Sequence, residues 1–144
     1  MCIRDRIYIY GDGSQERCFS YVDDCVDCME NSLIAENTSK EIINIGPDEE
    51  TVTIKELAQL CANEVGHNKE PIFVPSRPQE VKFATCSSDK ARKLLNYKTK
   101  VTLKESIKKT ADYIKTSGIK EFEYHIGLEI ENNLTPNTWK RKLI

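Results

Sequence analysis

The 144-residue sequence lacks a long hydrophobic run, because its longest unbroken apolar stretch is the segment 7–10. A membrane-spanning helix needs about 20 consecutive apolar residues, so none is expected. A basic excess is also missing, since 21 Lys and Arg residues stand against 23 Asp and Glu residues. Proteins that neutralise a phosphate backbone need such an excess, and we therefore expect neither nucleic acid nor a membrane as a partner.

No secretory signal is recognisable at the N-terminus. Arg4, Asp5 and Arg6 interrupt the place where an apolar h-region would have to lie. The expected location is therefore the cytoplasm, where the six cysteines stay reduced. Cys25 and Cys28 form a C-x-x-C pattern, which suits a redox pair or half a zinc site. Their spacing inside a predicted helix favours buried thiols, and a zinc or redox protein stays open as an alternative.

Motifs that would identify an active site directly are absent. The sequence has no G-x-G-x-x-G, no P-loop, no G-x-S-x-G and no H-E-x-x-H. None of its six tyrosines is followed by lysine four residues later. The two histidines, His67 and His125, have no suggestive neighbours. Residue chemistry alone therefore indicates no catalytic centre.

Short strands alternate with helices along the chain, which predicts an α/β fold. The apolar and alternating patterns predict strands over 7–10, 17–22, 41–46 and 71–75. Gly11-Asp-Gly13-Ser14 is a turn signal behind the first of them. The strands are short enough that helices must cover them to form a core.

Helices are predicted where apolar residues recur at helical spacing. The first begins with Asp23 and Asp24 and ends near Asn37; its expected buried residues are Val26, Met29, Leu33 and Ile34. Capping boxes at 53–56 and 102–105 open two more. The former helix repeats Ile54, Leu57, Ala58, Cys61 and Val65 at helical spacing. The latter is expected to turn Leu103, Ile107, Ala111 and Ile114 inward, and a short helix spans 89–95.

The run from Ile9 to Asp24, IYGDGSQERCFSYVDD, resembles a stretch of the extended short-chain dehydrogenase/reductases, which are NAD-dependent epimerases, dehydratases and decarboxylases of nucleotide sugars. Further matching motifs follow in the family's order: Asn44-Ile-Gly46, Ile54-Lys-Glu-Leu57, Arg77-Pro78, the segment 88–95 and the segment 101–107. Several ordered motifs make this resemblance more specific than a lone glycine motif.

The resemblance covers only the family's C-terminal, substrate-binding part. It implies a partial nucleotide-sugar domain over 7–117, with 1–6 as a non-native leader and 118–144 as a C-terminal tail. The family's N-terminal Rossmann half, with its glycine fingerprint and Tyr-x-x-x-Lys pair, is missing from the sequence. The resemblance thus implies NAD in the intact parent enzyme, none bound by this part alone, no catalytic residue here, and a homodimer for the whole enzyme.

Several site residues carry over from the family. Arg17 and Arg77 match arginines that contact the diphosphate of the nucleotide sugar, and a guanidinium suits that group because it grips phosphate oxygens in pairs. Glu80 stands where the family's Arg-Pro-Gly-Asp motif has an acid that contacts the ribose, although this chain reads Arg-Pro-Gln-Glu. The strand with Tyr8 and Tyr10 matches one that contacts the base, and Phe19 matches an aromatic residue lining the site.

The function expected from the sequence is substrate binding within an NAD-dependent nucleotide-sugar epimerase or dehydratase. The expected ligand is a nucleoside diphosphate sugar, with UDP-sugars favoured. One alternative is a stand-alone nucleotide-sugar binding module without catalysis. The other is the zinc or redox protein organised on Cys25 and Cys28.

Overall fold

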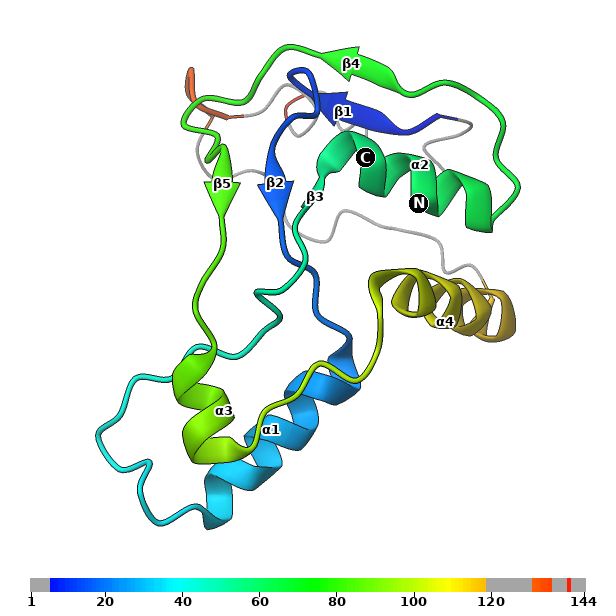
Figure 1. Cartoon of the computed structure of the whole chain (residues 1–144). Coiled ribbons are helices and arrows are strands. Elements are labelled where there is room, and N and C mark those ends of the chain that lie inside the picture. Colours follow the sequence, from blue (N-terminus) through cyan, green and yellow to red (C-terminus); the bar gives the residue numbers. More distant parts are fainter. Residues whose placement is uncertain (1–5, 119–130, 136–139, 141–144) are drawn as a thin grey trace.

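The protein is described by a computed structural model covering residues 6–118, 131–135 and 140. Two small sheets organise these residues (Figure 1). In one, β1 (Tyr8–Tyr10) pairs in parallel with β4 (Ile72–Val74). In the other, β2 (Glu16–Arg17) lies between β3 (Val52–Thr53) and β5 (Phe83–Ala84), antiparallel to the first and parallel to the second. The predicted α/β class is confirmed.

Two helices pack together near these sheets, and two more lie at the opposite end (Figure 1). The upper pair is α2 (Ile54–Glu64) and α4 (Leu103–Ser117), and the lower pair is α1 (Val22–Ile34) and α3 (Asp89–Leu95). No helix in the described residues is long and apolar enough to cross a membrane.

Both predicted capping boxes are confirmed. The Glu56 amide donates to Thr53 Oγ1 over 3.1 Å, and the Thr53 amide donates to Glu56 Oε2 over 2.9 Å. Thr102 and Glu105 repeat the arrangement over 3.3 and 3.0 Å. Each box satisfies amides that the first helical turn leaves without a partner. The starts of α2 and α4 are therefore encoded locally.

A compact core joins α1 to α3 and to the segment after Glu41. Asp24, only 2% exposed, accepts hydrogen bonds from the Lys100 and Val101 amides over 3.0 and 3.3 Å. It thereby ties the start of α1 to the chain before α4. The buried side chains of this core are Cys28, Ala91, Leu95 and Tyr97, with Ala35, Ile43, Ile45 and Leu94 packed against them.

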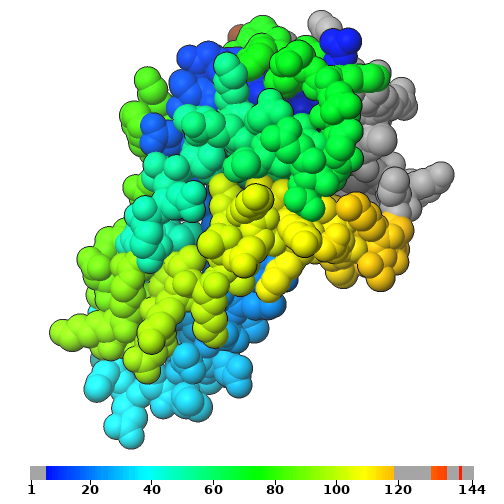
Figure 2. Space-filling view, turned by 45° about the vertical axis from the view of Figure 1, so that its right-hand side comes forward, coloured from blue at the N-terminus to red at the C-terminus, as the bar shows by residue number. Residues whose placement is uncertain are grey.

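The predicted buried face of α1 is wrong. Val26, Met29, Leu33 and Ile34 are 50, 59, 84 and 80% exposed, because α1 turns its Asp24 and Cys28 face inward instead. Figure 2 shows that α1 and the segment after it form a protruding end of the molecule. The helix also stops at Ile34, before Asn37, since Ala35 takes an extended conformation.

Two predicted strands also differ. The strand over 17–22 is only the pair 16–17, because β3 and β5 offer partners to those two residues and α1 already begins at Val22. The segment 41–46 is not a strand, since no described segment hydrogen-bonds to it as a ladder. It nevertheless alternates, with Ile42 86% exposed while Ile43 and Ile45 pack on the core.

Two residues of the predicted helical apolar patterns are exposed, and Ile114 was predicted to face inward. Val65 is the C-cap residue beyond α2 and is 59% exposed. Ile114 lies in the last turns of α4 and is 51% exposed, whereas the buried residues of α4, Ser106 and Ala111, lie closer to its start. Apolar spacing thus identified both helices correctly, but the inward position predicted for Ile114 is wrong.

Candidate functional site

The site begins with a tight turn over residues 77–80. The Glu80 amide donates to the Arg77 carbonyl over 3.4 Å, which closes a four-residue β-turn. Pro78 supplies the second position, and Gln79 takes the third with φ at 58°. A type II turn requires positive φ there, which explains why the matching family motif has glycine. Closing the turn lets Arg77 Nε donate to Glu80 Oε2 over 2.8 Å.

Arg17 reaches the same carboxylate from the central strand β2. Its Nη2 donates to Glu80 Oε1 over 3.3 Å and to the Val81 carbonyl over 2.6 Å. Its Nη1 donates to the Lys82 carbonyl over 3.3 Å and to the Glu16 carbonyl over 2.7 Å. The parallel pairing of β2 with β5 brings these segments together, although Arg17 and Lys82 are 65 residues apart. Arg17 therefore holds the backbone after the turn as well as Glu80.

Tyr10 completes the arrangement at the end of β1. The Arg77 guanidinium carbon lies 4.8 Å from the centroid of the Tyr10 ring, within cation–π range. The Gly11 amide donates to the Val74 carbonyl over 2.8 Å and extends the β1–β4 pairing to this point. A side chain at Gly11 would bring Cβ to 2.9 Å from Ser76 Oγ, so glycine permits the close approach. We call Tyr10, Arg17, Arg77 and Glu80 the arginine cluster.

The structure thus brings four of the six predicted site residues together. The Phe19 side chain is half-buried and lines a separate pocket of about 300 Å³ with Val52 and Leu103. Tyr8 is 37% exposed and pairs with Ile72. No described contact joins either aromatic residue to the arginine cluster. Whether any of the six contacts substrate stays a prediction.

Gln15, which follows the glycine turn, is a structural residue that the sequence motifs did not single out. It is 7% exposed, and its Nε2 donates to the Tyr10 carbonyl over 2.9 Å. Its Oε1 is buried without a hydrogen bond in the described part of the chain. Gln15 therefore braces the end of β1 that carries the Tyr10 ring. The sequence offered no local signal for this bond, because the short side-chain-to-backbone patterns belong to Ser, Thr, Asn and Asp.

The cluster is moderately solvent-exposed, which limits its electrostatic strength. The side chains of Arg17, Glu80 and Arg77 are 22, 17 and 42% exposed. Ion pairs at such exposure typically contribute up to about 1 kcal/mol each. Two guanidinium groups and one carboxylate give the arginine cluster a net charge of +1. The surface therefore suits a small anion with several oxygens.

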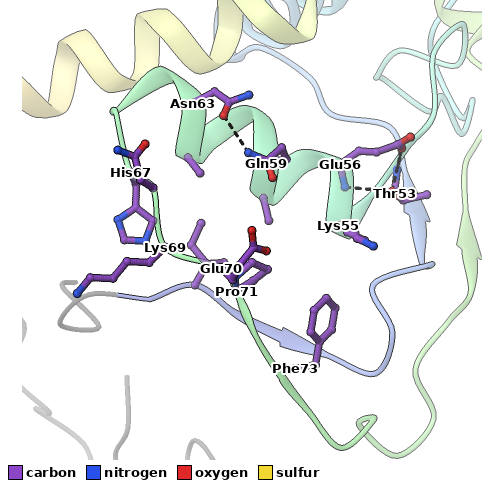
Figure 3. A pocket seen from close by; sticks show the side chains of 14 residues that line it. Thr53, Lys55, Glu56, Gln59, Asn63, His67, Lys69, Glu70, Pro71 and Phe73 are labelled. Carbon is purple, nitrogen blue, oxygen red and sulfur yellow. Dashed lines mark hydrogen bonds between the residues drawn. The ribbon is translucent and has the colours of Figure 1, made fainter.

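A larger hollow of about 690 Å³ lies between α2 and the segment leading into β4 (Figure 3). Thr53 and Glu56 in its wall are held by the capping box, and Gln59 Nε2 donates to Asn63 Oδ1 over 2.8 Å. His67 Nε2 is buried in this region without a hydrogen bond to any described residue. The residues of the arginine cluster line neither this hollow nor the pocket at Phe19.

Cys28 of the C-x-x-C pattern lies in the core between α1 and α3. Cys28 is 1% exposed and burial raises the pKa of its thiol, while Cys25 is half-buried. A raised pKa keeps a thiol protonated and unreactive. In residues 6–118, 131–135 and 140, no group of three or more His, Cys, Asp or Glu side chains is arranged to hold a metal ion. Cys2, His125 and most of the predicted tail lie outside the described residues.

Solved structures that are similar in fold to this chain include nucleotide-sugar epimerases. The UDP-glucose 4-epimerase from Thermotoga maritima, solved with UDP-glucose, matches with a TM-score of 0.72 and 30% identity over 78% of this chain and 35% of its own. The UDP-glucuronic acid 4-epimerase from Bacillus cereus, solved with UDP-glucuronic acid and NAD, matches with a TM-score of 0.72 and 32% identity over 78% of this chain and 36% of its own. The class is therefore that of the extended short-chain dehydrogenase/reductases that act as nucleotide-sugar epimerases and dehydratases.

Sequence comparison narrows this class to one family. The family model of GDP-mannose 4,6-dehydratase matches residues 3–110, and the chain belongs to that family. A putative UDP-glucose 4-epimerase from Methanocaldococcus jannaschii is 36% identical over 109 residues, which are 76% of this chain and 34% of that protein. A UDP-glucuronate 4-epimerase from Thermodesulfobacterium geofontis is 29% identical over 109 residues, 76% of this chain and 33% of its own. The chain spans about a third of the length of these relatives.

Proposed function

We propose that this chain is the substrate-binding part of an NAD-dependent nucleotide-sugar epimerase or dehydratase, and that the arginine cluster binds the diphosphate. The observation that carries the proposal is the convergence of Arg17 and Arg77 on one small surface, although they come from segments 60 residues apart in the sequence. Two guanidinium groups can hold both phosphates of a nucleoside diphosphate, and fixing this unreactive part orients the sugar for reaction. UDP-sugars are the favoured ligands.

The remaining site residues have supporting parts in this proposal. Glu80 accepts a hydrogen bond from a ribose hydroxyl, and the strand with Tyr8 and Tyr10 contacts the base. Phe19 lines the sugar-phosphate side. The whole enzyme, a cytoplasmic homodimer in this proposal, oxidises the sugar transiently with NAD. We assign the NAD-dependent step to the family's Rossmann half, which carries the glycine fingerprint and the Tyr-x-x-x-Lys pair.

Exposed apolar surface supports the idea that the chain functions packed against further protein. Val22, Val26, Met29 and Leu33 recur at helical spacing along α1 and are 60, 50, 59 and 84% exposed. Contiguous exposed apolar surface usually marks an interface. The segment 41–46, which packs on the opposite side of α1 around Cys28, alternates as a strand does but has no described strand partner. A Rossmann half would cover the stripe and pair with this segment.

The test is titration of UDP into the 144-residue chain by calorimetry. Arg77→Ala should weaken binding about tenfold, the loss expected for a charged hydrogen-bonding group that is partly exposed. Lys93→Ala, an equal charge change on the exposed face of α3, should leave binding within about twofold. Equal affinities of the wild type and Arg77→Ala would contradict the proposed site.

A second variant checks the other arginine. Arg17→Ala should abolish measurable binding, since it removes one phosphate contact and also releases the Val81 and Lys82 carbonyls. Because this change also loosens the segment, a thermal melt must show that the variant is folded. If folded Arg17→Ala binds UDP as the wild type does, Arg17 is only a structural residue.

A further inference from the structure

The Glu80 carboxylate fills the surface on which both arginines converge. Arg77 Nε donates to Oε2 over 2.8 Å and Arg77 Nη2 to Oε1 over 3.3 Å, a two-point grip of the kind that guanidinium groups use on phosphate. Arg17 Nη2 adds a contact to Oε1 over 3.3 Å. With its side chain 17% exposed, Glu80 is less accessible than either arginine.

The contacts of Arg17 show which of its bonds can be exchanged. Its other hydrogen bonds run to the backbone carbonyls of residues 16, 81 and 82. Residue 16 lies in β2, and the Lys82 carbonyl also accepts from the Glu16 amide over 2.9 Å beside the β2–β5 pairing. The bond to Glu80 ends on a side chain with three rotatable torsions. An incoming anion can therefore replace the carboxylate without disturbing the backbone, and it cannot use Arg77 fully while the carboxylate stays.

We propose that Glu80 is the internal anion of this site: without ligand its carboxylate occupies the position of a ligand phosphate between Arg17 and Arg77, and it must leave for the diphosphate to bind. The inference rests on the proposed function and adds a competing role for Glu80. The measured binding free energy of a diphosphate is then the difference between the interaction of the diphosphate with the two arginines and the interaction of Glu80 with them. Glu80 lowers that affinity, so weakly charged anions do not displace it.

Inorganic pyrophosphate is the probe, because it has no ribose that Glu80 could contact. Glu80→Gln keeps the side-chain shape and removes the charge. Pyrophosphate should therefore bind the Glu80→Gln variant of the full chain roughly fivefold tighter than it binds the wild type. Glu80→Asp keeps the charge on a side chain too short to reach both arginines, and its affinity should lie between the two. It also serves as the test variant if Glu80→Gln does not fold.

The matched control is Glu16→Gln. It removes the same charge one residue before Arg17, but the described contact of its carboxylate is Thr51 Oγ1 at 3.2 Å. Pyrophosphate affinity should change by less than about twofold, since only the screened long-range field changes. An equal gain in Glu16→Gln and Glu80→Gln would overturn the inference, because net charge alone would explain it.

The outcomes separate the inference from the function that it rests on. If Glu80→Gln and Glu80→Asp bind pyrophosphate no tighter than the wild type while Arg77→Ala loses UDP binding, the competing role is wrong and the diphosphate site stands. If folded wild type and all variants bind neither pyrophosphate nor UDP, the proposed function fails and the inference with it. Tighter pyrophosphate binding confined to the Glu80 variants supports both.

Discussion

The Arg77 guanidinium lies against the Tyr10 ring, with its central carbon 4.8 Å from the ring centroid. The two residues belong to different segments, and the pairing of β1 with β4 brings them together. A ring under a guanidinium restricts the directions in which the guanidinium N–H donors point. Arg77 needs this restriction because its side chain is 42% exposed and has few other contacts with described residues to hold it. The aromatic residue therefore orients Arg77 toward Glu80 and toward any anion that replaces it.

Replacing Tyr10 should weaken UDP binding through this orientation. Tyr10→Leu removes the ring and should cost about 0.5–1 kcal/mol, a twofold to fivefold rise in Kd by calorimetry. Tyr10→Phe keeps the ring and should retain most of the affinity. If Tyr10→Leu and Tyr10→Phe bind UDP with the same Kd, the ring does not orient Arg77.

Gln79 should be a point of backbone strain in the site turn. Its φ of 58° lies in the left-handed region, where a side chain costs about 1 kcal/mol relative to glycine. Gln79→Gly should therefore raise the free energy of unfolding by about that amount in urea titrations. Asn96, with φ at 53°, caps α3, and asparagine tolerates this region better. Asn96→Gly should raise the free energy of unfolding by only a few tenths of a kcal/mol. Equal increases in Gln79→Gly and Asn96→Gly would show that the backbone strain at positive φ does not depend on the residue type.

The glycine turn after β1 should tolerate no side chain at Gly13. A Cβ there would lie 2.9 Å from Lys55 Cβ and 3.2 Å from the Lys55 backbone nitrogen. The Lys55 amide also donates to the Gly13 carbonyl over 3.0 Å, so the two segments cannot separate cheaply. We expect Gly13→Ala to destabilise the chain by about 2–4 kcal/mol.

Gly66 provides the matched control for Gly13. Its φ of +68° is similar, but a Cβ would meet nothing described within 4 Å. Gly66→Ala should therefore cost only the backbone strain, about 1 kcal/mol in the same urea titrations. Similar losses in both variants would show that the close approach to Lys55 contributes nothing.

The ion pairs of Arg92 should make stability depend on acid pH. The pKa of the Asp48 carboxyl is lowered from 3.8 to about 2, mainly by its hydrogen bonds with the Arg92 guanidinium and secondly by the hydrogen bond from the Ser88 amide. Because the folded pKa is depressed, this contribution is complete above the unfolded value of 3.8 and is lost as the pH falls toward about 2. Arg92→Met should flatten that part of the stability profile, measured by urea unfolding between about pH 5 and pH 2.

Lys93→Met is the control for this pH effect. It removes one positive charge from the neighbouring position on α3, where the side chain is exposed. The acid slope should match that of the wild type, because Asp48 keeps its partner. A wild-type slope in Arg92→Met would mean that the Asp48 pair does not govern acid stability.

Local sequence signals predicted the features that neighbouring residues decide by themselves. The capping boxes at Thr53 and Thr102 and the turn at Gly11 depend on backbone geometry and on hydrogen bonds within three or four residues. The ordered family motifs added Arg17, Arg77 and Glu80 as candidate site residues. Their common location could not be derived from spacing, because more than 60 residues separate Arg17 from Glu80.

Only the tertiary structure decided which faces and strands have partners. Apolar periodicity identified α1, but Val26 and Met29 are exposed because α3 packs on the other face. The segment 41–46 has the sequence pattern of a strand but forms no ladder in the described residues. A strand needs a second backbone that accepts and donates hydrogen bonds. By itself, the sequence determined the two capped helix starts, the glycine turn after β1 and the candidate residues. The long-range pairing of β2 with β5 and β1 with β4 decided that two arginines, a carboxylate and a ring meet at one surface, because contacts between distant segments depend on the whole chain.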